Sequence, residues 1–228
     1  MGWPDATEFT EYLQASGLYG LTPSTREALL DLNGALNAGI ERWNEMTHYW
    51  PFMSNGDVDE RRFFDPPTGY ILDINGGLVT FTSLASDVAY DENSSSGFND
   101  SLSAGTARTN LLDFRLLPTD AAPRNKPWTH IRLGWTCTGG PGSVVVTGEW
   151  GYCRAANLPA SVRIAVMALA GNSLLPQITR LMLSNGLKEL TRGDETKKWL
   201  TPKEMKEGWD SDVAAAFAMG DYVRVRIA

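Results

Sequence analysis

The sequence has few of the features that identify a secreted, membrane or metal-dependent protein. Among 228 residues it has only two cysteines, Cys137 and Cys153, and two histidines, His48 and His130. This number is too small for a disulfide scaffold and argues against a dedicated zinc site. No apolar run approaches the roughly 20 residues that cross a bilayer, and the first residues lack the basic and apolar regions of a signal peptide. These absences predict a reduced, globular, cytosolic protein without a membrane segment.

Motifs typical of enzymes are also missing. Neither histidine lies near a nucleophile elbow, and there is no GxxxxGK[ST] loop. Residues 138–143 (TGGPGS) join two expected strands instead of opening a helix, so they do not predict a phosphate site. Residues 57–60 lack the oxygen spacing of a calcium loop. Apart from a carboxylate pair that only the fold could bring together, nothing indicates catalysis, and we expect no catalytic, cofactor-binding or metal-binding residue.

The net charge of −7 is unevenly distributed along the chain. Residues 1–60 hold ten acidic and two basic residues, a balance of −8, whereas residues 61–185 carry +1 and residues 186–228 are neutral. No cluster of basic residues predicts a nucleic-acid footprint. The acidic region is either a solvated surface of the N-terminal helices or a surface that repels DNA or meets a basic partner.

Helical periodicity marks the first part of the chain. A helix is expected over residues 5–16 with Asp5 as its cap. A longer one is expected over residues 23–46, where apolar residues recur every three or four positions and Ala35, Ala38 and Gly39 allow close approach of another helix.

The pattern of the last part mixes helix, polar chain and strand. A helix is expected after Pro159, and Pro176 is expected to kink or interrupt it. Residues 184–210 are polar and predict a mobile arm, which is followed by a short helix over about 210–219. Residues 222–227 alternate apolar and basic side chains, which is typical of a strand.

The middle of the chain has the period of strands. Short apolar or alternating runs lie at residues 61–64, 70–73, 78–81, 111–116, 128–133 and 144–150. Asn75-Gly76-Gly77 predicts a hairpin turn, and residues 91–109 predict a long exposed loop. A further hairpin about Gly140 would separate the two thiols by roughly 30 Å, so both cysteines are expected to stay free.

These elements predict an α+β fold. A helical core, made of the N-terminal helices and the helix after Pro159, carries an inserted antiparallel β-module of five or six strands and a C-terminal extended segment. The expected organisation is N-terminal helices in residues 1–60, the β-module in residues 61–153, and a C-terminal helix, polar arm and terminal strand in residues 154–228.

A motif at the end of the β-module resembles one family. The strand VVVTGEWGY is followed by LPASVRIAVMALA, which places Val146, Gly148, Trp150 and Gly151 ahead of Pro159, Val162, Ala165, Leu169 and Ala170. This pattern, V-x-G-x-W-G and then P-x-x-[VI]-x-x-A-x-x-x-L-A, is similar to that of the head–tail connector (adaptor) proteins of tailed bacteriophages. The order of elements agrees along essentially the whole chain, although the β-module and the 184–210 arm are longer than in compact members.

The resemblance implies a structural virion protein and no enzyme. Such proteins form a ring, usually of twelve copies, that docks beneath the portal, extends the DNA channel and supports the next neck or tail-completion protein. The expected partners are therefore further copies of the chain, the portal protein, the next neck protein and passing double-stranded DNA bound without sequence preference, with no membrane and no cofactor. The expected location is the neck of the virion, after assembly in the host cytoplasm.

Two sets of residues follow as site predictions. The segment Tyr222, Val223, Arg224, Val225, Arg226 and Ile227 is expected to pair with the portal or a neighbouring subunit, unless it closes the protein's own sheet. The residues expected to face the channel are Glu27, Asp31, Glu41 and Glu45.

Three alternatives stay open. The chain could be a head-closure protein or a tail terminator of the same neck. It could also be a β-rich ligand-binding module carried on helices, with Trp128, Trp135 and Trp150 as stacking platforms.

Overall fold

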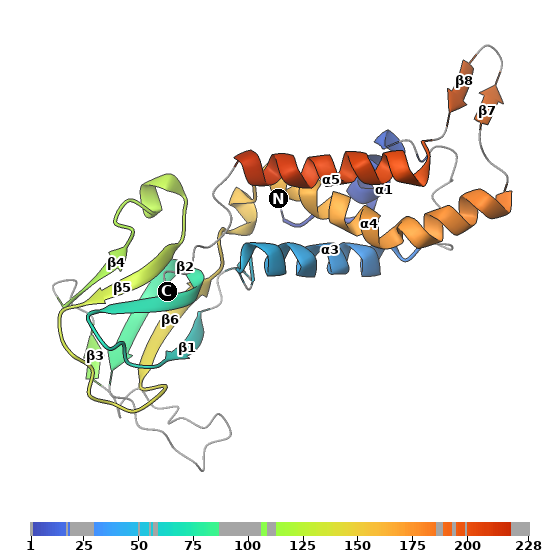
Figure 1. Ribbon diagram of the computed structural model, residues 1–228. Coiled ribbons are helices and arrows are strands. Elements are labelled where there is room, and N and C mark those ends of the chain that lie inside the picture. Colours follow the sequence, from blue (N-terminus) through green and yellow to red (C-terminus); the bar gives the residue numbers. More distant parts are fainter. Residues whose placement is uncertain are drawn as a thin grey trace. The chain divides into compact units, whose positions relative to one another are not determined.

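The structure is a computed structural model of the chain. The structure describes residues 2–16, 18, 30–49, 51–54, 56, 59–86, 106–108, 113–185, 189–192, 195–198 and 200–219. Two compact units share the chain: Tyr49–Asn157 forms a β unit, and Met1–His48 together with Leu158–Ala228 forms a helical unit. Helices in one unit and an antiparallel sheet in the other confirm the predicted α+β class (Figure 1).

The helical unit is built around one long helix. Its described elements are α1 (Ala6–Ala15), α3 (Leu32–Thr47), α4 (Ala160–Asn185), the hairpin strands β7 (Glu189–Arg192) and β8 (Glu195–Lys198), and α5 (Pro202–Met219). Helix α4 packs against both α3 and α5, while α1 contacts α3 and α4. The buried side chains of α4 therefore form the centre of this unit.

Helix α1 confirms the first helical prediction. Asp5 is its N-cap, since Oδ1 accepts the N–H groups of Thr7 and Glu8 at 2.8 and 2.9 Å. The Glu8 carboxylate reaches back to the Asp5 N–H, which completes a capping box. Phe9 and Leu13 are fully buried on the face that meets the rest of the unit.

Helix α3 begins later than the sequence pattern predicts. The chain bends at Leu30, and Asp31 caps a new helix by accepting the Gly34 N–H at 2.9 Å. A single helix over 23–46 is therefore wrong at residues 30–31, and residues 19–29 lie outside the described residues. The pattern misled because apolar spacing continues across a position where a local cap interrupts the backbone.

The predicted small-residue face of α3 packs inside the chain. Ala35 and Gly39 are buried, whereas Ala38 is exposed. A Cβ at Gly39 would lie 2.6 Å from the Val166 carbonyl oxygen of α4. The close approach that these residues permit is thus between α3 and α4, so this face is part of the core of the unit.

Helix α4 runs through Pro176 without interruption, so the predicted interruption is wrong, whereas the alternative of a kink stays a prediction. Proline removes one helical hydrogen bond and crowds the preceding turn, but it does not forbid a helix that is held on both sides. Leu174 and Ile178 flank Pro176 and are buried at 2 and 1% exposure. Tertiary packing therefore keeps the helix continuous.

The polar stretch predicted as an arm contains regular structure. Strands β7 and β8 pair within it, and α5 begins at Pro202, about eight residues earlier than expected. A capping box starts α5: the Glu204 carboxylate accepts the Thr201 N–H at 2.7 Å, and the Thr201 hydroxyl accepts the Glu204 N–H at 3.3 Å. The buried stripe of α5 consists of Met205, Trp209, Val213 and Ala216.

The β unit is a six-stranded sheet, antiparallel throughout, as predicted. Its strands are β1 (Glu60–Phe64), β2 (Ile71–Ser86), β3 (Thr106–Arg108), β4 (Phe114–Leu117), β5 (Trp128–Leu133) and β6 (Val144–Trp150). They follow the order β1-β6-β2-β5-β4, and β3 also pairs with β2. Strand β2 lies between β5 and β6, so the hairpin expected about Gly140 is wrong.

Asn75-Gly76-Gly77 is a bulge and not a hairpin turn. It lies inside the continuous strand β2, where the register against β5 shifts between Asp73 and Leu78. Gly76 and Gly77 have φ of 97° and 73°, values that residues other than glycine rarely adopt. Positive φ serves a turn and a bulge equally well, and only the partner strand distinguishes them.

The predicted loop over 91–109 is wrong at its end, where Thr106–Arg108 forms β3 opposite Leu84–Ser86. The rest of that segment lies outside the described residues. The core of the sheet is formed by its alternating inward side chains, among them Ile74, Leu84 and Ile131.

The two ends of the β unit are fastened to each other. The Tyr152 N–H donates to the Phe52 carbonyl at 2.6 Å, and the rings of these residues stack with centroids 4.7 Å apart. The Ser54 N–H donates to the Cys153 carbonyl at 2.9 Å, and Met53 forms a parallel bridge with Cys153. The chain thus enters and leaves this unit at one place.

Candidate interaction sites

The structure brings together two of the four predicted acidic residues. Glu41 and Glu45 are one turn apart on the exposed side of α3, and Arg42 Nη1 lies 2.8 Å from Glu45 Oε2. Asp31 instead caps that helix. Glu27 lies outside the described residues, as do the six predicted interface residues Tyr222–Ile227. The roles predicted for all of them stay predictions.

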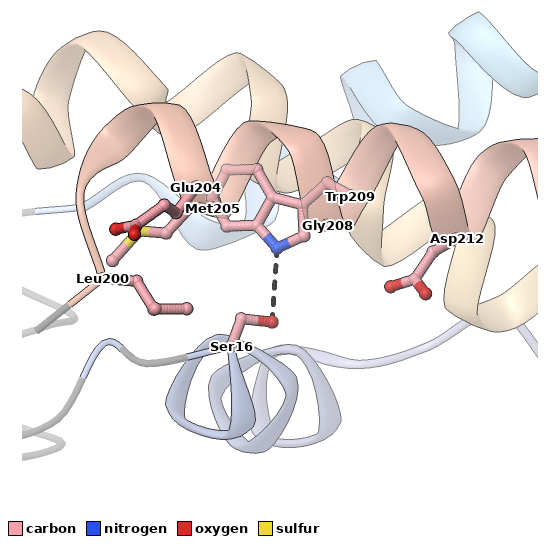
Figure 2. A pocket seen from close by; sticks show the side chains of 7 residues that line it. All are labelled: Ser16, Leu200, Glu204, Met205, Gly208, Trp209 and Asp212. Atoms are coloured by element: carbon pink, nitrogen blue, oxygen red, sulfur yellow. Dashed lines mark hydrogen bonds between the residues drawn. The ribbon is translucent and has the colours of Figure 1, made fainter.

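A cavity of about 130 Å³ lies between the end of α1 and the first turns of α5 (Figure 2). Trp209 Nε1 donates to Ser16 Oγ at 3.2 Å on one side of it, and Asp212 lies farther along the same helix. Its lining residues are Ser16, Leu200, Glu204, Met205, Gly208, Trp209 and Asp212. This volume is small compared with the 300–1,000 Å³ of drug-sized ligand sites.

The polar groups at this cavity already have partners within the chain. The Tyr12 hydroxyl donates to Asp212 Oδ2 at 2.5 Å, and Glu204 belongs to the capping box of α5. Burial, together with the Asp212 carboxylate, raises the pKa of Tyr12, so its hydroxyl stays protonated. The cavity therefore shows packing and hydrogen bonding between α1 and α5 and no pair of groups poised for catalysis.

A buried carboxylate lies in the β unit. Glu149 is only 3% exposed and accepts hydrogen bonds from Ser54 Oγ at 2.6 Å, Thr80 Oγ1 at 2.8 Å and Arg154 Nε at 2.8 Å. Burial alone would raise its pKa, but these three donors and the arginine charge together hold the pKa of Glu149 below its usual range. Because the carboxylate is fully engaged, it fastens β6 to β2 and to the segment around Ser54.

The outer face of the sheet carries an unusual row of side chains. Arg115 of β4 lies opposite Arg132 of β5, and Arg132 lies opposite Ile71 of β2. All three are exposed, and Ile71 and the preceding Tyr70 are each 55% exposed. Sequence reasoning missed this row because only the strand register brings its members together.

Of the three tryptophans proposed as stacking platforms, one is buried and two are partly buried. Trp150 is 3% exposed, donates its Nε1–H to the Glu60 carbonyl at 2.8 Å, and is covered by the Arg62 guanidinium 4.5 Å from its ring. Trp128 and Trp135 are partly buried against the core of the sheet. Of the three rings, Trp150 is therefore the one that the structure excludes as a stacking platform.

Neither cysteine forms a disulfide, as predicted. Cys153 is buried, and burial raises the pKa of its thiol to about 12.

Within the described ranges, no three His, Cys, Asp or Glu side chains gather as a metal site requires. No described helix is long and apolar enough to span a bilayer.

Comparison with solved structures gives distant likenesses, among them chains of two gene transfer agent structures. The neck of an empty gene transfer agent particle, determined with C6 symmetry, contains a chain 16% identical to this one, with a TM-score of 0.46, covering 96% of this chain and 90% of that chain. The virion of a native gene transfer agent particle contains a chain 16% identical, with a TM-score of 0.49, covering 99% of this chain and 91% of that chain. No protein-family model matches the sequence. No curated protein matches it either.

Proposed function

We propose that the chain is a structural protein of the neck of a phage-like particle, a head–tail connector whose copies form a ring beneath the portal and extend the DNA channel. The observation that carries the proposal is the motif shared with that family, which lies where the β unit passes into α4. The proposed activity is assembly, and no catalytic step is assigned to any residue.

The structure gives each half of the motif a physical role. Val146 and Trp150 are buried in β6, and a Cβ at Gly148 would lie 2.1 Å from the Thr80 carbonyl oxygen of β2. In the second half, Val162 and Ala165 are fully buried in the helical unit. The motif therefore specifies a tightly packed strand that leads into a buried helix, which supports the family resemblance as a resemblance of fold.

The finer parts of the proposal concern partners. A ring of about twelve copies, docking on the portal and attachment of the next neck protein follow from the resemblance. Residues Tyr222–Ile227 are proposed to reach the portal or a neighbouring copy as an added strand, in which main-chain hydrogen bonds supply affinity and the alternating apolar side chains supply specificity.

The test is to mix the purified chain with the portal protein of its own particle and image the mixture by negative-stain electron microscopy. We expect an added ring coaxial with the portal, and loss of that ring when residues 221–228 are deleted while the melting temperature stays unchanged. A truncated chain that no longer folds would place the segment in the protein's own sheet. Binding to an assembled head or to a tail end, but not to the isolated portal, would favour a head-closure or tail-terminator protein instead.

A further inference from the structure

The arginine row on the outer face of the β unit is electrostatically unbalanced. Like charges directly opposite each other on antiparallel strands destabilise a sheet, yet Arg115 and Arg132 are register partners. Three other arginines of this unit pair with a carboxylate: Arg62 with Glu60, Arg124 with Asp120 and Arg154 with Glu149. In the part of the chain that the structure describes, no carboxylate lies within ion-pair distance of either Arg115 or Arg132.

The neighbours of the two arginines indicate a protein partner. Ile71, which is 55% exposed, continues the row beyond Arg132, so a large apolar side chain lies exposed beside the charges. Arginine is one of the residues enriched at the energetic centre of protein interfaces. A DNA backbone would require a broader basic surface, whereas here the adjacent row contains Asp73, whose Oδ1 is 4.0 Å from His130 Nε2.

The chain itself carries a complementary surface. Its first 60 residues have a balance of −8, and Glu41 and Glu45 are exposed together on α3. Cβ atoms at i and i+4 on a helix are about 5–6 Å apart, and those of directly opposite strand residues are about 4.5–5.5 Å apart. The helical spacing of Glu41 and Glu45 therefore matches the cross-strand spacing of Arg115 and Arg132, so the two carboxylates can face the two guanidinium groups. The Glu45–Arg42 pair is exposed on both sides, so exchanging this partner costs little.

We infer that the row Ile71, Arg132 and Arg115 docks the Glu41–Glu45 face of α3 from a second copy of this chain. The contact joins two different surfaces, so it repeats from copy to copy and generates a closed ring or an open filament. It deepens the proposed function, on which it rests for the need to assemble, and it assigns Glu41 and Glu45 to a contact between copies instead of to the channel wall.

The experiment is a charge exchange monitored by sedimentation velocity on the full chain. The wild type is expected to self-associate at about 0.05 M salt and to dissociate at about 1 M salt, where the Debye length falls to about 3 Å. R115E/R132E and E41K/E45K, each alone, are expected to weaken self-association by more than about tenfold. Mixing the two variants is expected to restore hetero-association, because each supplies the charge that the other now lacks.

Arg124→Glu is the matched control, since Arg124 is an exposed arginine of the same unit that already has its own carboxylate. It is expected to assemble as the wild type does. Circular dichroism shows whether each variant is folded. If R115E/R132E does not fold, the self-association of E41K/E45K still tests the contact.

Several outcomes overturn the inference. The inference is wrong if the wild-type chain stays monomeric at low salt. It is also wrong if either double variant self-associates normally, or if mixing the two variants does not restore association. DNA binding that R115E/R132E abolishes while self-association persists would identify nucleic acid as the occupant. Portal binding, the test of the proposed function, is measured separately and can succeed when this contact fails.

Discussion

The β unit and the helical unit are assembled from the chain in different ways. All the strands of the sheet come from the continuous stretch Tyr49–Asn157, whereas the helical unit joins two segments separated by that whole stretch. The β unit buries a charged group, Glu149, within its interior. The helical unit instead has polar contacts between its two segments, where Arg163 pairs with Glu8 and Trp209 donates to Ser16. The comparison teaches that one unit depends on internal register and the other on contacts between distant segments.

The largest expected effect comes from a substitution in the core of the helical unit, and it tests whether this unit unfolds independently of the β unit. Trp209→Ala removes a side chain that is 1% exposed and is expected to cost about 4 kcal/mol of unfolding free energy. Hydrogen exchange should rise in peptides from α3, α4 and α5 while β5 and β6 stay protected. Trp209→Phe, which keeps most of the ring volume, should lose less. Equal loss of protection in both units would mean that they unfold as one.

A glycine substitution tests the register of the sheet. Gly148→Ala places a Cβ 2.1 Å from the Thr80 carbonyl oxygen, a backbone atom that cannot move without separating β6 from β2. We expect a loss of about 3 kcal/mol in urea unfolding. Gly140→Ala is the control, because a Cβ there meets nothing within 4 Å, and it should be close to neutral. Similar values for the two variants would contradict the strand pairing.

The buried charge gives the β unit a pH dependence of its own. Glu149→Gln is expected to cost about 2 kcal/mol at pH 7, because it weakens hydrogen bonds to a charged group whose partner Arg154 is half exposed. The pKa of Glu149 is lowered from 4.5 in the folded state, so its contribution is complete above about pH 5.5 and is lost as the pH falls below about 4.5.

The measurement is the difference in unfolding free energy between the wild type and Glu149→Gln as a function of pH. This difference should shrink as the pH falls from 5.5 to below 4.5. A difference that is constant across this range would show that the carboxylate does not titrate with folding.

The smallest effect concerns the start of α5. Thr201→Ala removes the hydroxyl that accepts the Glu204 N–H and is expected to cost about 1 kcal/mol. Thr201→Ser keeps a hydroxyl that can accept the same N–H, so it should lose only a small part of this unfolding free energy. Thermal unfolding of the three proteins checks the order, which would be wrong if alanine and serine behaved alike.

The sequence predicted those elements whose signals are local. Strands 128–133 and 144–150 were predicted at the observed residues because their apolar runs are bounded by turn residues on both sides. The start of α5 was missed although the capping box of Thr201 and Glu204 was visible, because the polar composition of the surrounding stretch dominated the interpretation.

The remaining features depend on residues far apart in the sequence. Whether Gly76 and Gly77 make a turn or a bulge depends on β5, some fifty residues away. The row of Ile71, Arg132 and Arg115 exists only through the registers of three strands. Among the predicted site residues, the exposure of Glu41 and Glu45 followed from helical spacing, whereas the capping role of Asp31 required the break before it.

The fastening of Phe52 to Tyr152 has a consequence for chain statistics. Bringing the ends of a flexible loop together costs an entropy that grows with the logarithm of its length. Folding of the β unit offsets this entropy loss, because the Tyr152 N–H donates to the Phe52 carbonyl at 2.6 Å and so holds the two ends together. For the helices on either side, a stretch of more than a hundred residues then behaves as a short connector, and its length can change in evolution with little entropic effect on how α3 finds α4.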